Sequence, residues 1–166
     1  MLHIRIEGAP EGKRAKRTRF GGRGVYTPKE DICAMRQVRE TAWLQCPGGG
    51  PDKGPIGVII VARTKRTKAL LAGRWGKIAE ALWSRVKPDA DNISKLYLDG
   101  LTRRKCPSGL PMWMADDAQV SLLCVQKLRC AIGEEPRVDL FIWRIRSAPK
   151  DVAIRRALMS MTENPE

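Results

Sequence analysis

The chain has 166 residues, which is close to the size of one domain and short for two. Its hydrophobic fraction of 43% is typical of a globular protein, and no stretch approaches the roughly 18 apolar residues of a membrane span. Residues 1–87 carry 19 basic and 7 acidic side chains, so they hold +12 of the total net charge of +13. An anionic membrane or solubility alone are alternatives, but this asymmetry favours nucleic acid as the partner.

Histidine and cysteine usage excludes several kinds of site. The only histidine, His3, lies next to the N-terminus, which argues against triads and metal sites built from histidine. The five cysteines are odd in number and include no Cys-x-x-Cys pair, so we expect neither a disulfide framework nor a zinc ribbon. Reduced, mostly buried thiols in a cytoplasmic protein are expected, because the N-terminus also lacks an apolar signal core.

The N-terminal half predicts a strand, a basic arm, a helix and a second strand. Residues 2–7 alternate between apolar and polar, as in a half-buried strand. Thr27 is the predicted N-cap of a helix that has Pro28 in its first position and ends near Cys46. The apolar run 56–62 suits a central strand. The basic arm, residues 9–24, is a loop suited to phosphate contacts or, alternatively, a solvated tail; its candidate DNA-binding residues are Lys13, Arg14, Lys16, Arg17 and Arg19.

The C-terminal half predicts further helices and two strands. Apolar side chains at helical spacing predict a second amphipathic helix that includes Trp75, Ile78, Ala79 and Leu82 and ends before Pro88. A third helix is expected over residues 91–101, strands over 120–128 and 138–145, and a short terminal helix from Pro149. We therefore expect one α/β (α+β) domain spanning residues 1–166, with a small mixed sheet flanked by helices.

Clustered carboxylates carry the candidate chemistry. Asp89 and Asp91 are alternate residues before a helix, so both can face one pocket, although N-capping is a structural alternative for Asp91. Lys95 follows Asp91 by one helical turn. Asp116 and Asp117 open the next predicted strand, and they would join the cluster if that strand begins beside the helix start. Carboxylates without histidine or cysteine favour Mg²⁺ or Mn²⁺, which indicates a metal-dependent nuclease.

The segment from Lys87 to Arg103, followed by residues 116–121, resembles the RusA family of Holliday-junction resolvases. The shared pattern is Asp-x-Asp-Asn, a lysine four residues after the second Asp, Leu-Asp-x-Leu-Thr, and then Asp-Asp-Ala-Gln-Val. This motif core spans residues 87–121, and a looser similarity covers residues 2–146. The resemblance implies a homodimeric, Mg²⁺-dependent endodeoxyribonuclease of bacteria or their phages that resolves four-way DNA junctions by paired symmetric nicks.

The same resemblance implies roles for individual residues. Metal-binding aspartates fall on Asp89, Asp91 and Asp117, and the catalytic lysine falls on Lys95. Asn92 and Asp99 match motif positions, for which we expect helix-start and structural roles. The choice between Asp116 and Asp117 stays open on strand geometry alone, and the family pattern favours Asp117.

The loop over residues 103–115 is longer than the family pattern leads us to expect. Arg103, Arg104 and Lys105 are candidate DNA contacts in it, and Trp113 either anchors the loop by packing or stacks on an unpaired base. Two alternatives to junction resolution remain. One is a metal-dependent nuclease that acts on flaps or single strands, and the other is a DNA-junction-binding module without catalysis.

Overall fold

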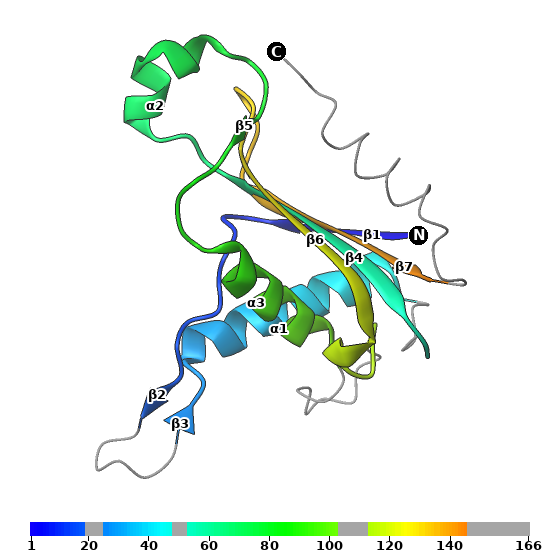
Figure 1. The fold of residues 1–166 in the computed structure, drawn as a ribbon. Coiled ribbons are helices and arrows are strands. Elements are labelled where there is room, and N and C mark those ends of the chain that lie inside the picture. The colour runs from blue at the N-terminus through cyan, green and yellow to red at the C-terminus, as the bar shows by residue number, and fades with distance from the viewer. Residues whose placement is uncertain (19–24, 48–52, 103–112, 146–166) are drawn as a thin grey trace.

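A five-stranded mixed sheet organises the chain, with the strand order β1-β7-β4-β6-β5 (Figure 1). The computed structural model describes residues 1–18, 25–47, 53–102 and 113–145. Neighbours β4 and β6 run parallel, whereas the other neighbouring strands are antiparallel. The strands of this sheet are β1 (Leu2–Glu7), β4 (Ile56–Thr64), β5 (Leu82–Trp83), β6 (Val120–Arg129) and β7 (Arg137–Arg144).

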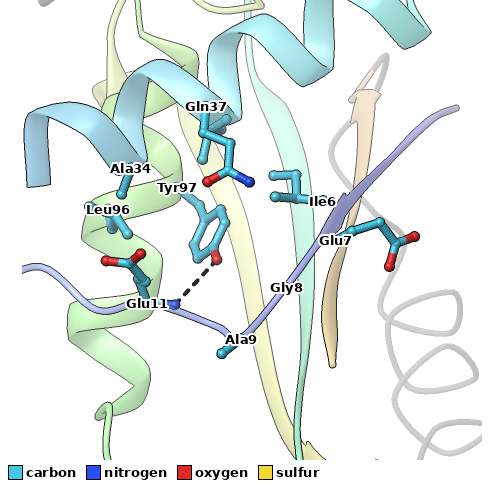
Figure 2. Close-up of a pocket in the computed structure, with 10 residues that line it drawn as sticks. Ile6, Glu7, Gly8, Ala9, Glu11, Ala34, Gln37, Leu96 and Tyr97 are labelled. Atoms are coloured by element: carbon cyan, nitrogen blue, oxygen red, sulfur yellow. Dashed lines mark hydrogen bonds between the residues drawn. The ribbon is translucent and has the colours of Figure 1, made fainter. Parts of the chain in front are cut away.

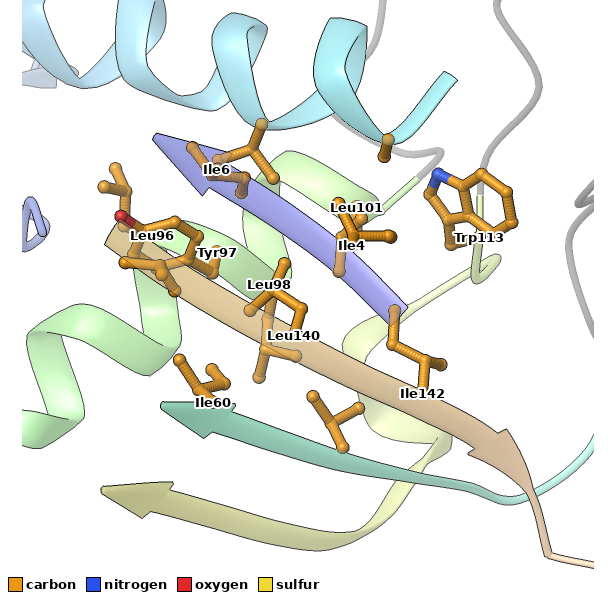
Figure 3. Close-up of a cluster of buried hydrophobic side chains, with 14 of the residues drawn as sticks. Ile4, Ile6, Ile60, Leu96, Tyr97, Leu98, Leu101, Trp113, Leu140 and Ile142 are labelled. Atoms are coloured by element: carbon orange, nitrogen blue, oxygen red, sulfur yellow. The ribbon is translucent and has the colours of Figure 1, made fainter. Parts of the chain in front are cut away.

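Two helices, α1 (Lys29–Gln45) and α3 (Ala90–Leu101), cover one face of the sheet (Figure 1). In α3 the apolar residues recur at helical spacing, so one side of the helix is buried against the strands. Each large apolar side chain buried in this way contributes about 1.5–3 kcal/mol. The result confirms the expected fold class, a mixed sheet packed against helices. The shared core (Figure 3) includes Ile4, Ile60, Leu96, Leu101 and Leu140.

The opposite face of the sheet carries a cluster of charged side chains around Asp139 of β7, which is 2% exposed. Asp139 points away from the helices because its neighbours in the strand, Val138 and Leu140, enter the core. The donors come from β1, β4 and β7 and so hold three strands in register. Their nitrogen atoms lie at these distances from the Asp139 carboxylate: His3 2.9 Å, Arg5 3.0 Å, Arg63 2.5 Å and Arg137 3.0 Å.

The prediction of a second amphipathic helix is wrong. That part of the chain instead forms the short helix α2 (Lys68–Ala72), the 3-10 turn η1 (Arg74–Lys77) and the edge strand β5. Gly76 passes so close to α2 that a Cβ atom there would lie 1.9 Å from a backbone oxygen of that helix. The buried Arg66 guanidinium also donates hydrogen bonds to backbone carbonyls of this segment. In a continuous helix those carbonyls would instead accept from backbone N–H groups of the helix itself.

Several boundaries also differ from those expected. Pro28 has an extended backbone (ψ 144°) and precedes α1, so Thr27 is not the cap of that helix. Asp89, not Asp91, is the N-cap residue of α3. The described end of the basic arm forms β2 (Arg17–Thr18), which pairs with β3 (Val25–Tyr26), rather than a plain loop. The predicted strands over 120–128 and 138–145 are confirmed, but β4 lies between them. The predicted terminal helix lies outside the described residues.

Two expectations from composition can also be compared with the structure. The four described cysteines are free thiols, as expected, but Cys130 alone among them is buried. None of the described helices is long and apolar enough to cross a membrane.

We predict that Asp139→Asn lowers the free energy of unfolding by about 3 kcal/mol at pH 7, because it leaves partly buried arginines without their carboxylate. Burial raises the pKa of Asp139, but hydrogen bonds from His3, Arg5 and Arg137 outweigh burial and bring the pKa below its ordinary value. The unfolded carboxyl titrates near 3.9, so the stabilisation is complete above about pH 5 and is lost as the pH falls through the lower folded pKa.

Urea denaturation of wild type and Asp139→Asn across this pH range measures the effect. The difference in unfolding free energy is expected to shrink as the pH falls below about 4. Glu135→Gln, at an exposed position, is the control and should change stability by no more than about 0.5 kcal/mol. A loss below 1 kcal/mol at pH 7 for Asp139→Asn would contradict the role given to this cluster.

Candidate active site

Two exposed aspartates mark the N-terminal end of α3. Asp89 has an extended backbone (φ −71°, ψ 152°) and is the N-cap residue, yet its side chain makes no capping hydrogen bond. Asp91 follows in the first turn, with 63% of its side chain exposed. Because the core side of the helix is occupied by apolar residues, both carboxylates stay in solvent. The positive end of the helix dipole stabilises negative charge at this position.

Lys95 lies one turn along α3 on the same side as Asp91. Its Nζ atom is 3.1 Å from Asp91 Oδ2, and both side chains are more than half exposed. The hydrogen bond from Lys95 lowers the pKa of the Asp91 carboxyl below its ordinary value, so this group is ionised at neutral pH. Exposed ion pairs of this kind are weak, and either partner can therefore exchange to a cation or a phosphate.

Asp99, the third acidic residue of the helix motif, has a different environment. It is 3% exposed, and its carboxylate pairs with the Lys13 ammonium. The Lys13 backbone nitrogen also donates to the Asn92 carbonyl at 2.9 Å. Both interactions attach the basic arm to α3. Asp99 therefore lies in the structural setting that was expected for it, away from the exposed carboxylates.

Arg14 is anchored in the same way, by Asp31 of α1. Its backbone nitrogen and its guanidinium donate to the fully buried Asp31 carboxylate at 3.0 Å and 2.8 Å. Two of the predicted DNA-binding residues, Lys13 and Arg14, thus have their charges engaged by buried acids. The sequence reading missed Asp31, although an acidic residue in a first turn next to a basic run was a usable signal. Lys16 and Arg17 are exposed, and Arg19 lies outside the described residues.

Asp116 and Asp117 differ clearly in their surroundings. They occupy a turn, the 3-10 helix η3 (Asp117–Gln119), rather than the start of a strand. The Asp116 carboxylate accepts from the Ala118 backbone nitrogen at 2.9 Å and forms a reciprocal capping box with Gln119. Asp117 is exposed, and its carboxylate makes no hydrogen bond or ion pair with another residue in the described part of the chain. Asp116 therefore has a structural role, and Asp117 is available to a ligand.

The exposed carboxylates of one chain do not converge. The 12 residues of α3 span about 18 Å at 1.5 Å per residue. Asp89 and Asp91 lie at its start, whereas η3 lies beyond its C-terminal end, where Thr102 forms a bridge with Met114 (Figure 1). Among residues 1–18, 25–47, 53–102 and 113–145, no three acidic, histidine or cysteine side chains gather as they would around a metal ion. The condition for a single-chain cluster, a strand start beside the helix start, is therefore not met.

A small pocket lies between the start of the basic arm and the helices α1 and α3 (Figure 2). Its volume of about 20 Å³ has room for roughly one water molecule. The Tyr97 hydroxyl accepts from the Glu11 backbone nitrogen at 3.5 Å, and burial raises the pKa of Tyr97 to about 12. This pocket is too small for a nucleotide, so it contributes to packing rather than to a substrate site.

The predicted basic loop contributes one described residue of note. Trp113 is 3% exposed and belongs to the hydrophobic core (Figure 3), which supports its role as a packing anchor and excludes base stacking in this conformation. Arg103, Arg104 and Lys105 lie outside the described residues.

Comparison with known proteins gives the chain a family. No curated protein matches it significantly. A family model described as endodeoxyribonuclease RusA matches residues 7–142, which is most of the chain and includes α3 with its aspartates and η3. The matched region therefore contains the candidate carboxylates and Lys95 within a single alignment to a DNA-cleaving family. The chain belongs to the RusA family of endodeoxyribonucleases and is an enzyme that cleaves DNA internally.

Proposed function

We propose that this enzyme is a Mg²⁺-dependent resolvase that nicks four-way DNA junctions symmetrically as a homodimer. The observation that carries the proposal is the exposed pair Asp89 and Asp91 beside Lys95, within a chain of a DNA-cleaving family. The enzyme would act in DNA recombination and repair in the bacterial cytoplasm. Its gene would belong to the bacterium or to a phage.

The donor set suits Mg²⁺, with Mn²⁺ as a substitute. Mg²⁺ prefers hard oxygen ligands and is commonly held by one or two carboxylates together with water and substrate phosphate. Asp89 and Asp91 offer such a pair, since the Asp89 side chain makes no capping hydrogen bond and Asp91 is ionised at neutral pH. When bound, the ion would activate a water molecule and neutralise charge on the scissile phosphate.

Lys95 stabilises the reaction from the neighbouring helical turn. In the DNA-free state its ammonium neutralises Asp91. With Asp91 holding a metal ion, the Lys95 ammonium would be free to donate to a non-bridging phosphate oxygen, where negative charge develops in the transition state. The N-terminus of α3 adds a favourable dipole for the same phosphate.

Asp117 enters the proposal through the second subunit. Because η3 and the start of α3 lie at opposite ends of one helix, Asp117 cannot join Asp89 and Asp91 of its own chain without rearrangement. A two-fold dimer that places α3 of one protomer against η3 of its partner would complete two equivalent sites. This replaces the simpler expectation of a complete site within each subunit.

Exposed cations would hold the junction arms by their phosphates. Lys16 and Arg17 remain candidates in the basic arm, together with Arg19 and the loop residues Arg103, Arg104 and Lys105. Lys13 and Arg14 act mainly by fixing the arm to α3 and α1.

The first test is cleavage of labelled synthetic substrates by the purified enzyme, with Mg²⁺ or with EDTA. We expect paired symmetric nicks in a four-way junction in Mg²⁺ and none in EDTA. Equal rates on flaps, single strands and duplex would indicate a less selective nuclease. Tight junction binding without nicking in any metal would indicate a binding module.

We predict that Asp91→Asn reduces the nicking rate at least about 100-fold, because a carboxylate that would hold the metal ion is lost. Junction affinity in EDTA should stay the same or increase, since a negative charge near the phosphates is removed. Gel-shift titration and single-turnover cleavage measure the two effects, with exposed Glu135→Gln as the control. Collapse of binding would show that Asp91 is mainly structural.

We further predict that mixing two inactive variants, Asp91→Asn and Asp117→Asn, restores cleavage. In a heterodimer with shared sites one site is intact, so a random mixture regains about one quarter of the wild-type sites and nicks one strand of a junction per dimer. Heterodimers isolated with two different affinity tags provide the measurement. An inactive heterodimer would contradict the shared site, because sites confined to single chains cannot complement.

A further inference from the structure

A basic excursion, residues 65–88, joins β4 to α3 and extends away from the core with α2 and β5 (Figure 1). It contains seven lysine or arginine residues and one acidic residue, Glu80, so it supplies +6 of the net charge of +13. One of the seven, Arg66, is buried. The other six, which are exposed, are Lys65, Lys68, Arg74, Lys77, Arg85 and Lys87.

These six cations have no carboxylate partners in the part of the chain that the structure describes. Several cations elsewhere in the described chain are paired, as Arg14 is with Asp31 and Arg63 with Asp139, but no other segment gathers as many exposed cations without a carboxylate partner. Unpaired positive charges that lie close together repel one another, and binding an anion relieves this repulsion. The excursion therefore carries the electrostatic signature of a surface that binds a polyanion.

Tryptophans are interleaved with these charges. Trp75 is 43% exposed, and the Arg74 guanidinium lies 4.7 Å from its ring centroid. Trp83 is 69% exposed and has no ring contact among the described residues. An aromatic ring this exposed offers an apolar face on which a nucleobase can stack. Trp83 also precedes Asp89 by only six residues, so it lies close in sequence to the candidate carboxylates.

The excursion is held in a defined shape. The Arg66 side chain is 6% exposed and donates to four backbone carbonyls, with distances of 2.7 Å to Cys130, 3.0 Å to Trp75 and 2.7 Å to Ile78. Its fourth acceptor is the Glu80 carbonyl. The Ser84 backbone nitrogen donates to the carbonyl of Lys127 in β6 at 2.9 Å. A surface fixed in this way loses little entropy when it binds.

We propose that the basic excursion is a DNA-binding element, in which exposed cations contact phosphates and Trp83 stacks on a base left unpaired at the strand-exchange point. The proposal rests on the proposed function, because it assigns this contact to the DNA that the same nuclease would cleave. Charge complementarity favours DNA over an apolar protein partner. An element of this kind binds the junction and discriminates it from continuous duplex through Trp83.

The phosphate contacts are tested with Arg74→Ala/Lys77→Ala/Arg85→Ala. Fluorescence anisotropy with a four-way junction and a duplex in EDTA should show affinity at least about tenfold weaker for both at 0.1 M salt. The slope of log affinity against log salt concentration is negative, and it should become less steep by about 2–3. Lys29→Ala/Arg36→Ala/Lys53→Ala, with the same charge change outside the excursion, is the control and should lose less. Equal losses of DNA affinity in the two triple variants would show that only the net charge of the protein matters, and would overturn the proposal.

Stacking is tested separately with Trp83→Ala. We expect about 5- to 150-fold weaker junction binding, with little change on duplex. Leu44→Ala, which removes an apolar side chain that is 80% exposed, is the matched control. Circular dichroism and thermal melting establish that each variant is folded, as expected for exposed positions.

Four outcomes of these experiments are decisive. Junction binding by Trp83→Ala at wild-type strength would overturn the stacking contact. Conversion of a dimer into monomers by Trp83→Ala in sedimentation velocity would show instead that a second copy covers this surface. Wild type that nicks junctions while the excursion variants bind normally would refute this inference alone, whereas wild type that neither binds nor nicks junctions would refute the proposed function as well.

Discussion

The parallel pairing of β4 with β6 is the constraint on which the rest of the structure depends. Parallel neighbours require the chain to return along the length of the sheet between them, and here α3 makes that return across the core face. The crossover places Asp89 and Asp91 at one end of α3 and delivers Asp117 to the other. Aspartates that are 26 or 28 positions apart in sequence are thus separated by a helix length in space, which is why the proposed site draws on two protomers.

Burial divides six of the aspartates into two sets with different roles. Asp31, Asp99 and Asp139 are buried, and each is compensated by lysine or arginine, so they stabilise the packing of the arm and the sheet. Asp89, Asp91 and Asp117 are exposed and take no part in the core. Separating a buried carboxylate from its cationic partner has a large free-energy cost, whereas an exposed carboxylate can exchange one partner for another easily. The exposed group is therefore the one suited to catalysis.

Local patterns predicted local structure well. The alternation over residues 2–7, the apolar run 56–62 and the helical spacing over 91–101 each specify an element through the face that it must bury, and the structure confirms them. The second predicted helix failed because its periodicity is overridden by Gly76 and by Arg66, which takes backbone carbonyls. The basic run around Lys13 predicted a DNA contact. Its ion pair with Asp99 was missed because Asp99 lies 86 positions away in the sequence, where no local pattern indicates the pairing.

The sequence by itself determined the fold class, the family and the identity of the candidate carboxylates and lysine, because these depend on residue type, spacing and hydrophobic period. Only the tertiary structure decided which charges are already neutralised and how far apart the carboxylates lie. Those properties depend on contacts between distant segments. Whether a charge is available for chemistry is set by the burial and the partners that folding gives it, and spacing along the chain does not encode either one.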